Sequence, residues 1–244
     1  MPARVLAWFS CGAASAVAAK LATEKYGEVC EVVYCWTLPT EHPDNARFFK
    51  DIETWLGRSI VILKSSQFAT VDEVFEARRY LAGIRGAPCT VYMKKMPRLE
   101  YQRKDDIHVF GYTVDEKRRM AQFNEAYPDV QTDWILKDRG ITKEDCLSIL
   151  KYAGVALPVM YTLGFHNNNC LGCVKASSPA YWAKIRKYFP DVFQRRAEQS
   201  RRFGARLIQR GGKREFLDEL PEKNFRDRDE NITCGPDCGA ITTT

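Results

Sequence analysis

Strand-like and helix-like patterns alternate through the first half of the chain, and this alternation constrains the fold more than any other feature. Apolar runs rich in aromatic and β-branched residues predict strands at residues 4–9, 28–36, 59–64 and 106–112. Segments with helical periodicity follow these runs at residues 14–27, 44–57, 71–83 and 115–127. Repeated strand–helix units predict an α/β fold with a doubly wound, mostly parallel sheet.

The length of the chain suggests one large domain with an appendage. With 244 residues, of which 45% are hydrophobic, the chain has enough apolar material for a substantial core. We expect an α/β domain over residues 1–165. A cysteine-rich and basic helical region is expected over residues 166–244.

Residues 5–22 admit a second interpretation, as a short apolar export signal that follows Arg4. The run contains Ser10, Gly12 and Ser15 and reaches only Lys20, whereas a membrane-spanning helix needs about 20 apolar residues. The nine cysteines leave one unpaired, which disfavours a secreted disulfide framework. We therefore expect a cytoplasmic protein with no membrane segment.

The turn after the first predicted strand is the first place to look for a ligand site. In an open parallel sheet, ligands bind at the carboxyl ends of the strands. Here Ser10, Gly12 and Ser15 stand between strand and helix, and Gly12 is expected to permit a tight turn that presents helix amides to an anion. A helix that is merely capped by serine is the alternative explanation.

Several segments, taken in order, resemble PP-loop enzymes related to phosphoadenylyl-sulfate (PAPS) reductase, adenylyl-sulfate (APS) reductase and ATP pyrophosphatases. The matching segments cover roughly residues 4–175 and are FSCGAAS, TLPTEHPDNARFFKDIETWLG, CTVYMKKMP and GYTVDEKRR. The resemblance implies a Rossmann-like PP-loop fold and an adenine nucleotide or sulfonucleotide as ligand. It implies nucleotide contacts from Ser10, Gly12, Ser15, Thr40, Glu41, Asp115, Glu116 and Arg118.

Two departures from the family pattern concern the charge around the nucleotide. Ala14 stands where ATP-cleaving members carry an aspartate for magnesium, which favours the sulfonucleotide reductases. Thr113 stands where an arginine would meet the substrate, and Arg118 and Arg119 are the candidates to replace it. Asp115 and Glu116 are equally suited to the first turn of a helix.

The cysteines suggest an inorganic centre. Cys170 and Cys173 form a C-x-x-C, and the resemblance to APS reductase implies that they bind a [4Fe–4S] cluster together with Cys89 and Cys234. Thr90 replaces the family's second ligand, so the fourth iron is either held by Cys234 or left open. Zinc bound by the same thiols is the alternative, and His166 is a further candidate ligand or supporting donor.

The resemblance also implies a reaction. Cys238 would attack the sulfate sulfur as a thiolate, Lys94 would lie at the sulfate, and a thioredoxin-like dithiol would release sulfite. The histidine that ends the family's C-terminal motif is replaced by Ile241, so a metal-binding or flexible tail is the alternative role of this segment.

The segment from Lys184 to Arg214 is strongly basic. It has eleven Lys and Arg against two acidic residues, a surplus of nine in a chain whose net charge is +6. Arginines at 195, 202, 206 and 210 are spaced to share one stripe of a helix. Such a stripe suits tRNA or DNA, as expected of an ATP-dependent sulfurtransferase, but it is equally a solvated helix face.

A third hypothesis is a zinc-stabilised nucleic-acid-binding protein with a degenerate PP-loop fold. It is based on the replacements Ala14, Thr90 and Thr113, which all remove residues found in active relatives. His108 lies in a predicted apolar strand and is expected to be a packed core residue.

Overall fold

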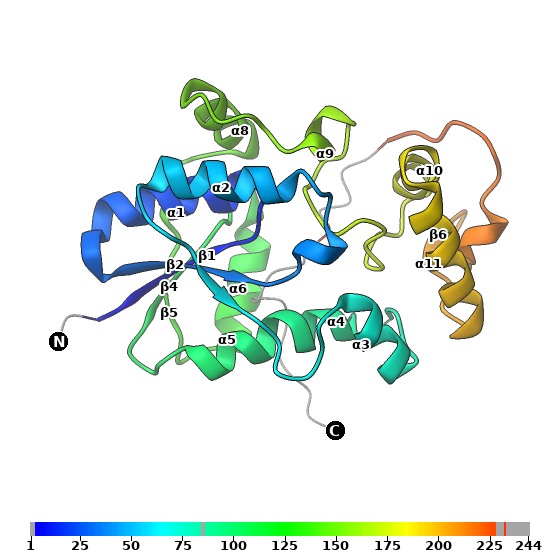
Figure 1. Cartoon of the computed structure of the whole chain (residues 1–244), viewed down its shortest axis with the longest axis horizontal. Helices are drawn as coiled ribbons and strands as arrows, with labels where there is room; N and C mark the ends of the chain where they lie inside the picture. The colour runs from blue at the N-terminus through cyan, green and yellow to red at the C-terminus, as the bar shows by residue number, and fades with distance from the viewer. Residues whose placement is uncertain (1–2, 84–85, 228–231, 233–244) are drawn as a thin grey trace.

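The computed structural model describes residues 3–83, 86–227 and 232, and its centre is a sheet of parallel strands. The five strands are β1 (Val5–Phe9), β2 (Cys30–Cys35), β3 (Val61–Leu63), β4 (Ile107–Phe110) and β5 (Gln131–Asp133). Their order is β3-β2-β1-β4-β5, so the chain first runs outward from β1 and then crosses back to β4 (Figure 1). The predicted α/β, Rossmann-like doubly wound fold is confirmed.

Helices cover both faces of the sheet. They are α1 (Ala13–Tyr26), α2 (Asn45–Leu56), α5 (Met96–Tyr101), α6 (Lys117–Ala126), α7 (Ile135–Asp138) and α8 (Lys143–Tyr152). In Figure 1, α1, α2 and α8 lie on one side of the sheet and α5 and α6 on the other. Strand β1 explains this arrangement, since all of its residues are buried, as a strand covered on both faces requires.

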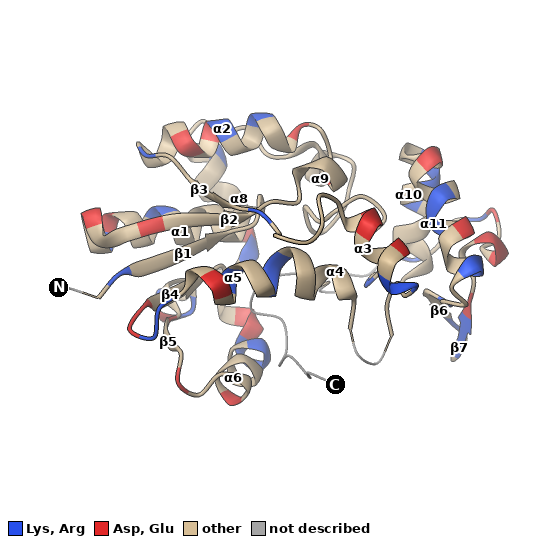
Figure 2. Cartoon of the chain, turned by 60° about the horizontal axis from the view of Figure 1, so that its bottom comes forward, with Lys and Arg blue, Asp and Glu red and all other residues tan. Residues whose placement is uncertain are grey.

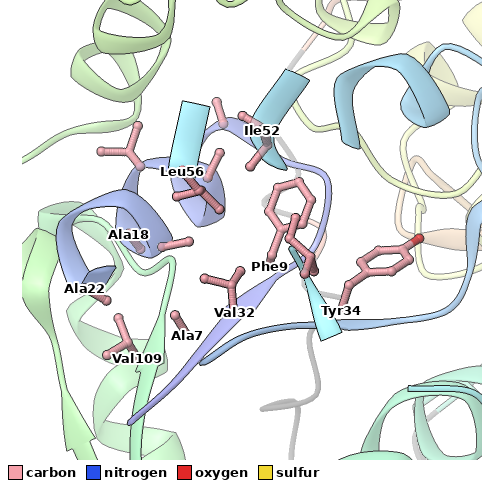
Figure 3. Packing of buried hydrophobic residues seen from close by; sticks show 14 of the residues in the cluster. Ala7, Phe9, Ala18, Ala22, Val32, Tyr34, Ile52, Leu56 and Val109 are labelled. Atoms are coloured by element: carbon pink, nitrogen blue, oxygen red, sulfur yellow. The ribbon is translucent and has the colours of Figure 1, made fainter. Parts of the chain in front are cut away.

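The side chains of β1 alternate between two apolar clusters. Ala7 and Phe9 pack with the alanine-rich face of α1 and with α2, as Figure 3 shows. Leu6 and Trp8 pack on the opposite side with β4 and α6. Tyr34 belongs to the first cluster, but its hydroxyl points away from the other labelled side chains of that cluster (Figure 3). The apolar core therefore ends near the carboxyl ends of β1 and β2, where polar groups begin.

A third apolar cluster lies beyond the sheet and is mostly helical. The elements around it are α3 (Val71–Arg78), α4 (Pro88–Thr90), the π-helical turn η3 (Val91–Lys95), α10 (Pro179–Tyr188), α11 (Pro190–Arg202), β6 (Ile208–Arg210), β7 (Lys213–Glu215) and η5 (Leu217–Glu219). Phe75 of α3 and Trp182 of α10 are among its buried members. The cluster thus joins residues on both sides of position 165.

Several predicted boundaries need correction. The helix expected over 71–83 ends at Arg78, because Arg79 adopts a left-handed conformation with φ of 47°. The edge strand β5 was not predicted, because its sequence Gln-Thr-Asp has no apolar pattern. In the part of the chain that the structure describes, no helix has both the length and the apolar character needed to cross a bilayer.

Candidate functional site

The order of the strands creates a crevice between the carboxyl ends of β1 and β4. The chain leaves these neighbouring strands in opposite directions, and such a switch point is where open α/β sheets bind ligands. A cavity of about 430 Å³ lies there. Its wall includes the predicted site residues Ser10, Gly12, Ser15, Glu41, Lys94, Asp115, Glu116 and Cys170.

The turn after β1 is organised around the hydroxyl of Ser15. This hydroxyl accepts hydrogen bonds from Ser10 N at 3.1 Å and from Ser10 Oγ at 3.2 Å, and it donates to Gly12 O at 2.9 Å. The left-handed residue is Cys11, with φ of 55°, whereas Gly12 is extended with φ of −104°. Gly12 therefore does not supply the tight turn that the sequence suggested. Its missing side chain instead leaves room beside Ser10, Ser15 and the cavity.

Gly111, at the end of β4, lets that strand approach the start of α1. A Cβ added at Gly111 would lie 2.6 Å from both Cα and N of Ser15. Those atoms belong to backbone and cannot move aside as a flexible side chain can. Glycine at this position therefore brings the two sides of the cavity together.

The N-terminus of α1 faces the cavity. Its first three amides have no carbonyl partner within the helix, and they carry the positive end of the helix dipole. Ala13 N donates to the Tyr161 hydroxyl at 3.2 Å. Tyr161 lies in the short helix α9 (Val159–Thr162). Burial raises its pKa to about 12, so it is a neutral phenol at ordinary pH. Ala14 and Ser15 line the cavity and present the remaining amides to a ligand.

Glu41 is held in a buried polar network. Its carboxylate accepts hydrogen bonds from Thr37 Oγ1 at 2.6 Å, Tyr34 OH at 3.1 Å and Asn45 Nδ2 at 2.7 Å. Burial and the nearby Glu41 carboxylate raise the pKa of Tyr34 well above its usual value. The carboxylate is thus fixed in position at the cavity wall. Thr40, predicted beside it, does not line the cavity.

Of the two arginines predicted after β4, Arg119 rather than Arg118 lies at the cavity. Thr113 N and Oγ1 donate to Glu116 Oε2 at 3.0 and 3.2 Å, which closes a capping box. Arg119 pairs with Glu116, lies 4.2 Å from the centre of the Tyr112 ring and lines the cavity. Arg118 is exposed and is not part of the wall. Arg119 therefore occupies the position proposed for Arg118.

Lys94 reaches the cavity from η3. It is buried, and its backbone oxygen accepts a 3.6 Å hydrogen bond from the Cys35 thiol. Burial raises the pKa of Cys35 to about 12, against the opposing effect of Lys94. Cys35 is therefore an inert core thiol. Lys94 brings a cation into the wall that also contains the start of α1.

The C-x-x-C turn is anchored on three sides. Tyr181 OH accepts from Cys173 N at 2.8 Å and donates to Cys170 O at 3.4 Å. Gly172 has a positive φ of 63°, and its carbonyl accepts from Arg196 Nε at 3.2 Å. Thr40 Oγ1 donates to Cys170 Sγ. The turn is held rigidly, with Cys170 at the cavity and Cys173 buried.

The predicted metal ligands are only partly within the described residues. Cys89 lies in α4 and packs against the helical cluster that also contains Val174. Within residues 3–83, 86–227 and 232, no three His, Cys, Asp or Glu side chains form a group that could hold a metal ion. Cys234 and Cys238 lie outside the described residues. The described thiols alone thus do not complete a four-ligand set, and the cluster stays a prediction of the resemblance.

The basic segment does not form the predicted helical stripe. Helix α11 ends at Arg202, because Gly204 has a positive φ of 67° and the chain turns; Arg210 lies on β6. Six of the eleven basic side chains, namely Lys184, Arg195, Arg196, Arg201, Arg202 and Arg210, form ion pairs. Figure 2 accordingly shows basic and acidic positions interspersed around α11.

The two histidines considered in the sequence analysis, His108 and His166, both have structural partners. His108 is buried, and its Nδ1 accepts a 2.9 Å hydrogen bond from Trp8 Nε1. Burial lowers its pKa to about 4, so the prediction of a packed core histidine is confirmed. His166 Nε2 lies 3.2 Å from Asp227 Oδ2, which also pairs with Lys184.

Sequence reasoning missed several residues of the cavity wall, among them Lys143, Tyr161, Asn168 and Asn169. In the segment HNNNCLGC it considered only the histidine and the two cysteines as site residues. Three consecutive asparagines before the C-x-x-C were the available signal, because buried amides need hydrogen-bond partners. No protein-family model and no curated protein matches this sequence.

Proposed function

We propose that the chain binds the adenosine 5′-phosphate part of a sulfonucleotide in this cavity and reduces the activated sulfate through a cysteine thiolate. The observation that carries the proposal is that the first turn, Lys94 and Cys170 line one cavity. Helix amides suit a phosphate, and the lysine suits a sulfate. The sulfonucleotide reductases that the sequence resembles place a phosphate-binding turn, a lysine and cysteines around one substrate.

The wall favours a sulfonucleotide over magnesium-dependent cleavage of ATP. At the helix start, Ala14 offers no carboxylate to a metal ion. Of the four carboxylates in the wall, Glu41 and Glu116 already accept hydrogen bonds from protein groups, and Asp115 and Glu144 belong to η4 (Val114–Glu116) and α8 rather than to the start of α1. Magnesium at a triphosphate needs carboxylate oxygens that are free to coordinate it.

In the proposed reaction, Cys238 attacks the sulfate sulfur as a thiolate. A sulfur–sulfur bond forms, the bond from sulfur to the bridging oxygen breaks, and the nucleotide phosphate leaves with that electron pair. A thioredoxin-like dithiol then attacks the cysteine sulfur and releases sulfite, and its second thiol restores Cys238. The dithiol is oxidised to a disulfide and supplies the two electrons.

The described residues would hold the substrate during this reaction. Amides at the start of α1 and the cation of Lys94 offset the negative charge on the leaving phosphate and on the sulfate. The Tyr161 phenol is neutral and adds no charge of its own. The ring of Tyr112 holds Arg119 in the cavity wall by a cation–π contact.

Sulfite release tests the proposal. Native protein given reduced thioredoxin should release sulfite from APS or PAPS, and Cys238→Ser should abolish this release. Cys146→Ala removes a thiol buried in the sheet core and should leave the rate unchanged. No sulfite from either substrate would refute the reductase, whereas thiolated tRNA or DNA formed only with ATP would identify a sulfurtransferase.

The proposed cluster is tested separately. The resemblance assigns Cys89, Cys170, Cys173 and Cys234 as the thiolates that would hold a [4Fe–4S] centre close to the sulfate. Anaerobically purified protein should then be brown and absorb at about 400 nm, as thiolate-bound iron–sulfur clusters do. A colourless protein with one bound zinc ion would identify the zinc alternative.

A further inference from the structure

Asn168 occupies an unusual position in the cavity wall. Its side-chain nitrogen donates to Cys11 O at 2.6 Å and to Asn45 Oδ1 at 2.8 Å. Cys11 O can only accept, so this contact fixes which end of the amide carries the nitrogen. Both amide hydrogens are therefore used, and the orientation of Asn168 is set by chemistry.

The oxygen of the same amide has no corresponding partner. Asn168 is only 6% exposed, and its Oδ1 accepts no hydrogen bond from any described residue. The next residue has the complementary feature, because Asn169 Nδ2 is also buried without a hydrogen-bond partner in the described chain. Both residues line the cavity. A buried amide oxygen left unpaired is costly, so this wall is suited to a ligand that supplies the missing donor.

We propose that Asn168 Oδ1 accepts a hydrogen bond from a neutral N–H or O–H group of the bound nucleotide and thereby determines which nucleotide binds. The inference rests on the proposed function and adds a specificity-determining residue to it. A phosphate has no neutral donor and would place oxygen against oxygen, so the anionic groups of the ligand bind elsewhere, at the start of α1 and at Lys94.

The same amide links two parts of the site. Through Cys11 O it holds the first turn, and through Asn45 it joins the network of Glu41. Asn168 also lies two positions before Cys170, whose turn is anchored on α10 and α11. A ligand that donates a hydrogen bond to Oδ1 would therefore supply the missing partner of the residue that connects the turn after β1 to the C-x-x-C.

Three groups of adenosine 5′-phosphate can supply the donor, namely the 6-amino group and the 2′- and 3′-hydroxyls. AMP contains the moiety common to APS, PAPS and ATP, so it is the reference ligand. Calorimetric titration would compare it with purine riboside 5′-phosphate, 2′-deoxy-AMP and 3′-deoxy-AMP. We expect one analogue to bind native protein about tenfold more weakly or worse, as a buried acceptor left unpaired predicts.

Variants connect that loss to Asn168. In Asn168→Ala, AMP should bind more weakly, and the affinity ratio between AMP and the sensitive analogue should fall to about one, because the acceptor is gone. Asn167→Ala is the matched control, since Asn167 Oδ1 already accepts from Lys143 at 3.0 Å. This control should keep the ratio even if its affinity for AMP changes.

The outcomes separate this inference from the proposed function. AMP binding with equal affinity for all three analogues overturns the role of Asn168 and leaves the nucleotide site intact. A ratio that persists in Asn168→Ala also overturns it, and failure of native protein to bind AMP overturns both proposals. If Asn168→Ala does not fold, equal affinities for all analogues on native protein still overturn the role of Asn168. Sensitivity to the 3′-hydroxyl would further favour APS over PAPS, whose 3′-oxygen carries a phosphate.

Discussion

The Thr40 hydroxyl donates a hydrogen bond to the thiol sulfur of Cys170 across 3.4 Å, although the two residues are 130 positions apart in sequence. A backbone bond reinforces this contact, because Leu171 N donates to Thr40 O at 2.9 Å. The loop after β2 and the C-x-x-C turn are thus joined by side chain and backbone together. The loop that carries Glu41 and the turn that carries Cys170 therefore hold each other in position at the cavity.

Replacing Gly111 by alanine should damage the fold and the site together. The added Cβ would lie 2.6 Å from backbone atoms of Ser15, so β4 and α1 would have to separate. We expect the free energy of unfolding to fall by about 3 kcal/mol, at the upper end for overpacked cores, and AMP binding to be lost. Urea denaturation and titration calorimetry would measure the two effects.

Gly12→Ala is the control for this substitution. Gly12 has a negative φ, and the nearest atom to its added Cβ would be Tyr161 OH at an ordinary contact distance of 3.7 Å. Its free energy of unfolding should change by less than about 1 kcal/mol. Equal losses in the two variants would contradict the close approach assigned to Gly111.

His108 should make the fold sensitive to mild acid. Burial lowers its pKa to about 4 from the ordinary histidine value of 6.5, and the charge of Arg98 acts in the same direction while Asp106 opposes it. Between these two pH values the unfolded chain binds a proton that the folded chain does not, so stability is full above about pH 6.5 and falls as the pH drops towards 4. The loss over this window should be about 3 kcal/mol.

Urea denaturation at a series of pH values would measure this slope. His108→Phe should flatten it, because the buried titrating group is gone, whatever the effect of the substitution on stability at neutral pH. His166→Gln changes a histidine at the surface and should retain the slope. A slope that survives in His108→Phe would show that another group causes it.

The sequence predicts the sheet well because its strands carry local signals. The strands β1, β2 and β4 are apolar runs that are visible without tertiary information. The edge strand β5 is short and polar, and it is defined by pairing with β4 rather than by its own composition. Its existence therefore follows from the sheet and not from the segment.

The side chains of the cavity are harder to predict, because long-range packing selects them. Arg119 rather than Arg118 faces the cavity, and a one-residue difference in helical phase decides this. Tyr161 and Asn168 meet the first turn across about 150 positions of sequence, as the separations of 148 and 157 residues show. The prediction of a basic helical stripe was wrong for a local reason. Glycine commonly ends helices, and Gly204 lies between the predicted positions 202 and 206.

Arg196 should be essential for attaching α11 to α3. It is 1% exposed, pairs with Asp72 and stacks on the Phe75 ring at 5.0 Å. Burial alone would raise the pKa of Asp72, but the charge and hydrogen bond of Arg196 lower it overall. Asp72→Asn would leave the guanidinium buried without its counter-charge, and we expect about 3 kcal/mol of destabilisation.

Arg195→Met is the corresponding control, because this neighbour also lies near Asp72, at 3.5 Å, but is half exposed. An exposed ion pair contributes less than about 1 kcal/mol. Thermal or urea denaturation would separate the two variants. Equal effects of Asp72→Asn and Arg195→Met would mean that the buried pair does not hold the helices together.

Arg119 and Arg118 provide the most direct test of the cavity as an anion site. Arg119 lines the wall and is held over the Tyr112 ring, whereas Arg118 is exposed outside it. Arg119→Met should weaken AMP binding by about tenfold, since a charge-assisted hydrogen bond contributes roughly 1.5–3 kcal/mol. Arg118→Met removes the same single positive charge from the protein. It should leave the affinity for AMP within about twofold, because an exposed charge is screened. Titration at two salt concentrations would distinguish a direct contact from a general loss of positive charge. If Arg119 contacts AMP directly, the affinities of the two variants still differ at high salt. If their affinities converge at high salt, Arg119 does not contact the ligand.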